Sequence, residues 1–328
     1  MEPTPPQSGP EPTPETGKRP AIHWRSLLGA VLAGLALVAI VVSTGVLWFS
    51  SHSQKPPTEM EAQFQLLRTQ VQELRQEQQM PSLVLNRYRN SICYIFGVYH
   101  VSFRGKEAHP ALRAHVAGTG FMVADGLLAT NRHVAEPWYG DPEAQALIRR
   151  GGEPGLDKLL AYFPGMPTPI AIDPVVVSPL HDLAIVRMET APETPPAALP
   201  LAAQLPAPGE LVTVIGYPLG VAGMVAKSPQ AVYERLAFRK DDAGAASELA
   251  ALSLIRPSAT YGHLGDIVGS KLVYDAPTAH GGSGGPVIDS HGNVIGINTA
   301  YMDGFSGGTL GISVVALKPM VDVARQAK

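Results

Sequence analysis

Three short segments of the sequence each carry a side chain that could take part in nucleophilic catalysis. Ser283 stands in the middle of the glycine-rich run 281–285, while His133 and Asp182 each stand at one end of an apolar run. A serine nucleophile needs a base to accept its proton, a group that orients the base, and donors for the oxyanion that forms. The three segments therefore supply candidates for a complete nucleophilic site.

The glycine-rich run could also supply the donors. Glycines on both sides of Ser283 let the backbone turn sharply and approach a substrate carbonyl closely. The N–H groups of Gly281 and Ser283, with Gly282 between them, are the candidate oxyanion hole, which contributes about 3–4 kcal/mol to transition-state stability. The run lacks the Gly-Lys-Ser/Thr signature of a phosphate-binding loop.

Each segment also has a simpler interpretation when it is taken alone. A glycine-rich run can be only a turn, and an aspartate before a strand is ordinarily a turn residue. Metal binding by His181 with His133 or His280 is conceivable, but the chain has no HExxH motif or comparable ligand spacing. We expect no metal and no cofactor. The single cysteine, Cys93, lies in an apolar run and is expected to be a small buried residue.

The elements that must position these side chains are predicted to be short strands. Apolar, β-branched runs recur along residues 82–328, separated by Gly, Pro and Asp, which predicts an all-β fold. Residues 141–160 are expected to be loop-like or helical, and residues 229–252 to be an inserted helix capped by Ser228 and Pro229. The predicted strands lie at 92–101, 119–123, 127–129, 170–177, 183–188, 211–215, 286–288, 294–297 and 310–315.

The first part of the chain has a different composition. Residues 1–26 are rich in Pro, Thr, Glu and Gly, which predicts a disordered tail. Residues 27–49 form an uncharged apolar run that would be about 34 Å long as a helix, enough to cross a bilayer. Trp24 and Trp48 lie at its two ends, and no small-residue cleavage site follows it, so an anchor is favoured over a cleaved signal peptide.

The flanking charges predict the orientation of this span. Lys18, Arg19 and Arg25 precede it, whereas Lys55 alone follows closely. By the positive-inside rule the amino terminus stays in the cytoplasm and the rest is exported. We expect a single-pass membrane protein of a bacterial inner membrane, with residues 82–328 in the periplasm.

A stalk is predicted between the span and the strands, over residues 50–81. Thr58 and Glu61 match a capping box that starts a helix, and Pro81 is expected to end it. Its apolar residues follow a heptad pattern, which allows a homo-oligomer through residues 58–80. The alternative is a helix that lies against the membrane or the strand domain. The pattern is carried by Met60, Phe64, Leu67, Val71 and Leu74.

Composition limits the classes of partner. The formal net charge is -3 and charged residues make up 16% of the chain. No basic run extends beyond isolated pairs, so we expect no nucleic-acid partner.

Taken together, the motifs resemble those of the HtrA (Deg-type) branch of trypsin-like serine proteases. The resemblance covers most of residues 90–320 in the family's order of His, Asp and Ser. It rests on the runs Gly118–Val123, Thr130–Val134, Asp182–Ala184, Asp275–Ala276, Gly281–Pro286 and Gly292–Ala300.

The resemblance implies two six-stranded β-barrels with an active site in the cleft between them. It makes His133 the general base, Asp182 the residue that orients it, and Ser283 a nucleophile that forms an acyl-enzyme with polypeptide substrates. The pocket for the side chain before the scissile bond would accept small or medium aliphatic groups, because no charged residue marks its floor. Its implied lining residues are Thr278, Ala279, Asn298, Thr299, Ala300 and Tyr301.

The sequence departs from the family at three points. Gly282 replaces the residue before the serine, usually Asn in this branch and Asp in trypsins, so it cannot form the trypsin activation salt bridge. His280 replaces a common Pro and is either a solvent-facing loop residue or a pH-sensing or pocket residue. No PDZ-like domain follows the short helical tail, expected from Lys318 onward.

These departures leave three functions to consider. The first is a membrane-anchored endopeptidase that cleaves misfolded or regulatory proteins. The second is a chaperone or binding module with a protease fold and little turnover. The third is a membrane organiser that acts through the stalk helix.

Overall fold

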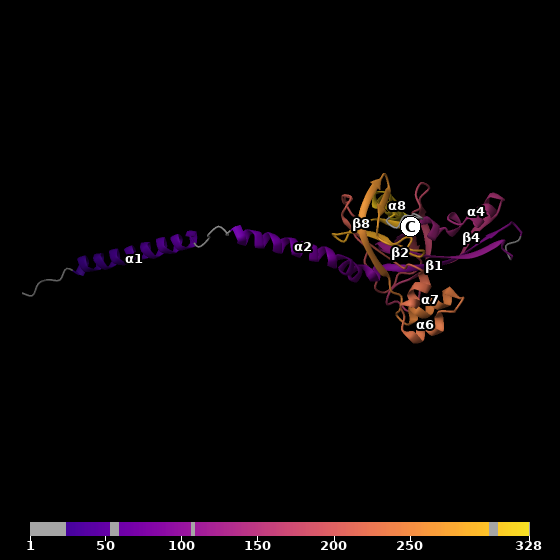
Figure 1. Ribbon diagram of the computed structural model, residues 1–328, viewed down its shortest axis with the longest axis horizontal. Coiled ribbons are helices and arrows are strands. Elements are labelled where there is room, and N and C mark those ends of the chain that lie inside the picture. The colour runs from indigo at the N-terminus through magenta and orange to yellow at the C-terminus, as the bar shows by residue number, and fades with distance from the viewer. Residues whose placement is uncertain (1–23, 53–58, 106–108, 302–307, 328) are drawn as a thin grey trace, which may run out of the picture. The chain divides into compact units, whose positions relative to one another are not determined.

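The computed structural model describes residues 24–52, 59–105, 109–301 and 308–327, and separates into two units, Met1–Thr69 and Gln70–Lys328 (Figure 1). Of the tail predicted to be disordered, residues 1–26, the first 23 residues lie outside the described part of the chain. Helix α1 (Trp24–His52) contains the predicted span. Its segment Leu32–Phe49 has a mean hydropathy of 2.3 and no buried residue, so α1 is long and apolar enough to cross a membrane.

Helix α2 (Glu59–Tyr88) corrects the prediction that Pro81 ends the stalk helix. The helix continues through Pro81 for seven more residues, although proline removes one backbone donor. Val84 and Tyr88, four residues apart on one face, are both buried in the core of the second unit, and this packing favours the longer helix. Thr58, the predicted cap, lies outside the described residues.

Two closed six-stranded barrels make up most of the second unit, as predicted. The first has the strand order β1-β2-β3-β6-β5-β4 and the second β10-β11-β12-β9-β8-β7, and neighbouring strands pair antiparallel throughout. Closure gives every strand a neighbour on both sides over at least part of its length. The first barrel consists of β1 (Ile92–Ser102), β2 (Leu112–Ala124), β3 (Leu127–Thr130), β4 (Glu153–Tyr162), β5 (Ile170–Val177) and β6 (Ala184–Met188). The second consists of β7 (Leu211–Gly216), β8 (Ser258–Val268), β9 (Lys271–Tyr274), β10 (Pro286–Asp289), β11 (Val294–Tyr301) and β12 (Thr309–Ser313).

The core follows from the alternation of side chains along these strands. On β1, Ile92 and Tyr94 belong to the large cluster that continues into the second barrel. Cys93 and Ile95 point to the other face and join a separate cluster formed by first-barrel residues. Both faces of β1 are therefore buried. Cys93 is buried, as predicted, and this burial raises the pKa of its thiol.

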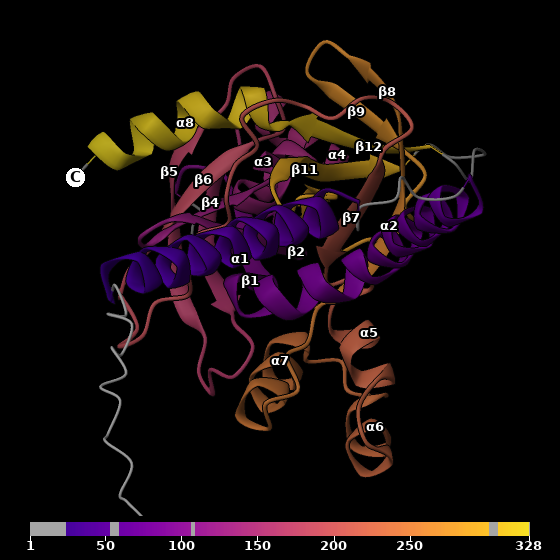
Figure 2. The same ribbon diagram turned by 90° about the vertical axis from the view of Figure 1, so that its left-hand side faces the viewer.

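The helices of the second unit correct two further predictions. Residues 141–160 contain a helix, α4, but also most of strand β4. The insertion predicted as one helix over 229–252 is two helices, α6 and α7, and α5 precedes them; together they form a lobe beside the barrels (Figure 2). The C-terminal helix α8 begins at Val314 and continues through Pro319. The shorter elements are η1 (Arg89–Ser91), α3 (Arg132–Ala135), η2 (Pro137–Tyr139), α4 (Pro142–Arg149), α5 (Gly220–Ala226), α6 (Gln230–Leu236), α7 (Asp242–Ala251) and α8 (Val314–Gln326).

Candidate active site

His133 and Asp182 are brought together by the pairing of β3 with β6. Thr130 at the end of β3 lies opposite Ala184 at the start of β6, so the segments that carry the two side chains are neighbours. His133 Nδ1 lies 2.7 Å from Asp182 Oδ2, and the His133 backbone N–H donates to Oδ1 at 2.9 Å. Because a carboxylate only accepts, Nδ1 carries the proton, and Nε2 of the neutral ring is left as an acceptor.

The surroundings of Asp182 favour its ionised form. Burial alone would raise the pKa of this carboxyl group, but hydrogen bonds from His133 and Thr299, and the positive charge that the His133 ring carries when it is protonated, hold the pKa below its usual value. Thr299 Oγ1 donates to Oδ2 at 2.7 Å from strand β11. Residues of both barrels therefore stabilise the same carboxylate.

Ser283 lies in the loop between β9 and β10 and lines the same cavity as His133 and Asp182. Its Oγ donates to the carbonyl of Thr299 at 3.1 Å. Within the described residues no hydrogen bond joins this hydroxyl to His133. Catalytic hydrogen bonds are often long or misaligned in the absence of substrate, so this geometry does not exclude Ser283 as the partner of the base.

The backbone of the loop leaves two donors free. The Gly282 N–H donates to Ala279 O at 2.9 Å, which closes a four-residue turn over residues 279–282. Gly281, with φ +88°, takes the left-handed position of this turn, which favours glycine. The bond to Ala279 O corrects the prediction that Gly282 is part of the oxyanion hole, since its N–H is already engaged. Among the described residues, no acceptor receives the N–H of Gly281 or of Ser283.

The first barrel holds this loop through one buried residue of β2. Thr119 Oγ1 donates to Gly281 O at 2.7 Å, and the Thr119 N–H donates to Ser283 O at 2.8 Å. Its side chain also accepts from the Tyr217 N–H at 3.1 Å. The position of the loop thus depends on both barrels.

The cavity has a volume of about 520 Å³ and collects most of the predicted site residues. The backbone of Ala300 and Tyr301 continues along β11, but their side chains lie outside the described residues. Apart from His280, Asp182 and His133, the lining residues carry no ionisable side chain except the phenol of Tyr139. The lining consists of His133, Tyr139, Gly140, Asp182, Thr278, Ala279, His280, Ser283, Asn298 and Thr299.

Sequence reasoning missed two of these residues, Tyr139 and Gly140. A Cβ atom at Gly140 would lie 2.9 Å from His133 Cβ, so the close approach of this segment to the histidine requires glycine. Arg132 stacks on the Tyr139 ring, 4.2 Å from its centroid. The only signal in the sequence was a Trp-Tyr-Gly run shortly after the histidine, which by itself indicates no chemistry.

No group of three His, Cys, Asp or Glu side chains in the described part of the chain is arranged to hold a metal ion. His181 is separated from the cavity, and its Nδ1 lies 3.5 Å from Ser270 Oγ.

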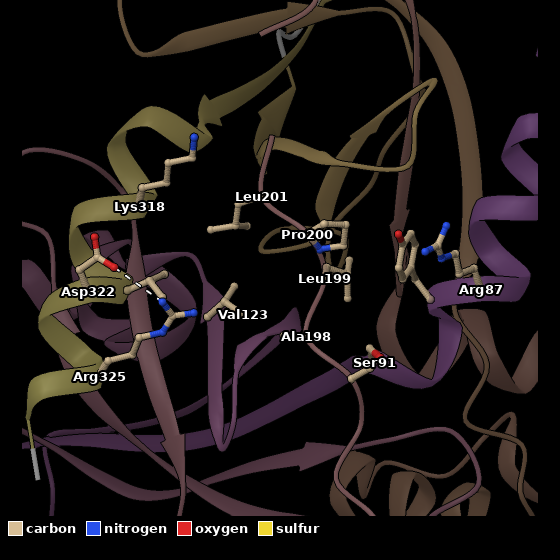
Figure 3. Close-up of a pocket in the computed structure, with 13 residues that line it drawn as sticks. Arg87, Ser91, Val123, Ala198, Leu199, Pro200, Leu201, Lys318, Asp322 and Arg325 are labelled. Atoms are coloured by element: carbon tan, nitrogen blue, oxygen red, sulfur yellow. Dashed lines mark ion pairs between the residues drawn. The ribbon is translucent and has the colours of Figure 1, made fainter. Parts of the chain in front are cut away.

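A second, larger cavity of about 760 Å³ lies elsewhere on the same unit, between the end of α2, the segment 197–201 and α8 (Figure 3). Three cationic side chains, Arg87, Lys318 and Arg325, and one carboxylate, Asp322, line it, and Asp322 lies 3.8 Å from Arg325. No histidine lines this cavity and it shares no residue with the smaller one. The groups needed for nucleophilic catalysis therefore meet in the smaller cavity.

Comparison with known proteins shows the family of the chain. The model of the trypsin-like peptidase domain matches residues 118–297, a segment that includes His133, Asp182 and Ser283. The chain belongs to the trypsin-like peptidase family. As a trypsin-like peptidase it is a serine protease by class. No curated protein matches the chain. Among solved structures, the chain is similar to the serine endoprotease from Yersinia pestis at 16% identity and a TM-score of 0.47, over 75% of this chain and 66% of that chain. The trypsin-like peptidase thus spans just under two thirds of the length of that structure.

Proposed function

We propose that this protein is a membrane-anchored serine endopeptidase that hydrolyses peptide bonds in misfolded or regulatory proteins. The observation that carries the proposal is the single cavity in which the His133–Asp182 pair meets Ser283, whose loop has two unused backbone N–H groups.

In the proposed reaction His133 Nε2 accepts the proton of Ser283 as Oγ attacks the scissile carbonyl. Asp182 keeps the ring in the tautomer that has Nε2 free, and it stabilises the imidazolium that forms. The N–H groups of Gly281 and Ser283 donate to the oxyanion of the tetrahedral intermediate. The imidazolium then protonates the leaving amine, and the acyl-enzyme is hydrolysed by water with His133 again as base.

The cavity walls support substrates with an uncharged side chain before the scissile bond. Thr278, Ala279, Asn298 and Thr299 line the cavity, and no lysine, arginine or glutamate lies among its described lining residues. Small or medium side chains fit this lining, and a charged side chain would lack a counter-ion.

Helix α1 is proposed to anchor the protein in a bacterial inner membrane, with residues 82–328 in the periplasm. Support comes from its apolar segment Leu32–Phe49 and from the excess of basic residues before the helix. The heptad residues of α2 support self-association, because Met60, Phe64 and Leu67 are 61–69% exposed.

One observation favours a second function, a chaperone or binding module with little turnover. Ser283 Oγ donates to Thr299 O instead of to the base, which is the geometry of a resting site. A measurement of substrate turnover distinguishes the endopeptidase, which cleaves its substrate, from the binding module, which only holds it.

The test is cleavage of fluorescently labelled, unfolded casein by the full-length protein in detergent micelles. We expect fragments to appear with the wild type and not with Ser283→Ala, and binding of casein to survive in the variant. Binding without cleavage by the wild type would instead support the chaperone.

A further inference from the structure

The two free N–H groups of the nucleophile loop belong to peptide units whose carbonyls are tied down. The peptide His280–Gly281 places its oxygen against the Leu219 N–H at 2.6 Å. The peptide Gly282–Ser283 places its oxygen against Asn298 Nδ2 at 2.9 Å, and the Gly285 N–H also donates to this oxygen, at 3.1 Å. All described peptide bonds are trans, so C=O and N–H of each unit point in opposite directions. A donor that holds the carbonyl therefore directs the N–H.

Both the oxygen and the nitrogen of the Asn298 side-chain amide make hydrogen bonds. Asn298 is 1% exposed on β11, and the Tyr274 hydroxyl donates to its Oδ1 at 2.7 Å. Because the oxygen is occupied by a donor, both Nδ2 hydrogens face the loop, one toward Gly282 O and one toward Thr278 Oγ1 at 3.0 Å. Its backbone joins the same loop, since the Gly284 N–H donates to Asn298 O at 2.8 Å.

The space beside Gly282 is filled by these same partners. A Cβ atom at Gly282 would lie 2.6 Å from Thr278 Oγ1, 3.0 Å from Ala279 O and 3.6 Å from Asn298 Nδ2. Residue 282 therefore has no room for a side chain of its own to hold the loop. The amide that does so comes from the neighbouring strand.

We propose that Asn298 is a positioning residue for catalysis. Its amide, fixed by Tyr274, holds the Gly282 carbonyl away from the cleft and thereby directs the Ser283 N–H toward the substrate oxyanion. This inference rests on the proposed endopeptidase function. It differs from the role expected from the sequence, in which Asn298 only lines the substrate pocket.

The two roles predict different kinetics. A pocket-wall residue changes KM according to the substrate side chain before the scissile bond. A residue that aims an oxyanion donor changes kcat for all substrates alike, because that interaction is made only in the transition state.

The experiment compares the full-length wild type with Asn298→Ala and Asn298→Asp on peptide p-nitroanilides that end in Ala, Val, Leu, Met or Gln. We expect kcat to fall by about 10²–10³ for every substrate, the cost of losing one oxyanion donor, while KM stays within about threefold. Aspartate keeps the size of asparagine but has no N–H for Gly282 O. The matched control is Asn293→Ala, directly before β11, where the side chain contacts Asp289, and its kcat should stay within about twofold.

Tyr274→Phe tests the same idea without removing Asn298, should the alanine variant fail to fold. Loss of the hydroxyl frees the amide to rotate, so kcat should fall by about tenfold for every substrate. In a second measurement, the hemiketal that Ser283 forms with a peptidyl trifluoromethyl ketone is titrated by ¹⁹F NMR. The pKa of its oxyanion should be higher in Asn298→Ala and Tyr274→Phe than in the wild type.

An unchanged kcat and unchanged hemiketal pKa in these variants, or a loss confined to KM for particular side chains, overturns the inference alone. A wild type that neither turns over the peptides nor forms an adduct at Ser283 overturns the proposed function and this inference with it.

Discussion

At the scale of single residues, the carboxylate of Asp182 is held by three hydrogen bonds. Its carboxylate accepts from the ring and backbone of His133 and from Thr299, and its own backbone carbonyl accepts from Asn131 Nδ2 at 2.8 Å. Three donors on one carboxylate fix its position and, through it, the tautomer of the base.

Replacing Asp182 with asparagine tests this arrangement kinetically. The introduced amide would face His133 Nδ1 and favour the tautomer with the proton on Nε2, the wrong nitrogen for a base. We expect kcat on peptide p-nitroanilides to fall by about 10³–10⁴-fold with a smaller change in KM. A loss below tenfold would mean that this pair does not orient the base.

The same variant tests the lowered pKa of Asp182. A carboxyl group whose pKa is lower in the folded state stabilises the fold above its unfolded pKa, near 4, and loses this contribution as pH falls through the folded pKa. The difference in free energy of unfolding between wild type and Asp182→Asn should therefore be largest near pH 7 and shrink below about pH 4. Denaturant titrations at both pH values measure it, and an equal difference at both would contradict the lowered pKa.

Which site residues the sequence could predict depends on whether their role is local. His133, Asp182 and Ser283 each stand beside a strand in a short motif, so the sequence supplied them as candidates, and the resemblance to the HtrA branch joined them into one site. Two hydrogen bonds of the site could not be predicted in this way, the one from the Gly282 N–H to Ala279 O and the one from Asn298 Nδ2 to Gly282 O. Both depend on how the loop and strand β11 approach each other in the fold. No periodicity in the sequence reports such contacts.

At the scale of elements, the errors arise where packing overrides a local signal. Pro81 predicts a helix end, but Val84 and Tyr88 gain more from burial than the helix loses at proline. The strand Ser258–Val268 was missed because its two glycines and its mostly exposed or half-exposed residues lack a clear alternation. The strand Glu153–Tyr162 begins Glu-Pro-Gly, which predicts a turn.

The end of α7 offers a test of backbone strain. The Leu254 N–H donates to Leu249 O at 2.8 Å and the Ser253 N–H to Ala250 O at 2.9 Å, the two bonds of a Schellman motif. Ser253 holds the left-handed position, with φ +57°, that glycine normally takes.

Ser253→Gly should therefore raise the free energy of unfolding by about 0.5–1 kcal/mol, because glycine adopts this conformation without a Cβ clash. Ser253→Ala keeps the clash and is the matched control, with an expected change near zero. Denaturation followed by circular dichroism gives both values. A glycine variant no more stable than the alanine variant would contradict the strain.

At the scale of the whole molecule, the strands expected from the sequence indicated an all-β fold, and the resemblance to trypsin-like proteases implied the double barrel that the structure has. The membrane anchor is a separate prediction. We expect the full-length protein, expressed in bacteria, to remain in the membrane pellet after alkaline carbonate and to keep its amino terminus. Val38→Arg places a charge in the apolar helix at a cost of about 2.5–3.5 kcal/mol and should release protein, whereas Val38→Leu should not. A mature chain that begins after α1 would identify a cleaved signal sequence instead.

The central claim is that Ser283 is the nucleophile of an assembled triad. The most direct measurement treats the full-length protein in detergent micelles with a fluorophosphonate probe and locates the adduct by mass spectrometry. We predict one modified residue, Ser283, and loss of labelling in His133→Ala. A folded wild type with no adduct at Ser283, or equal labelling without His133, would contradict the claim.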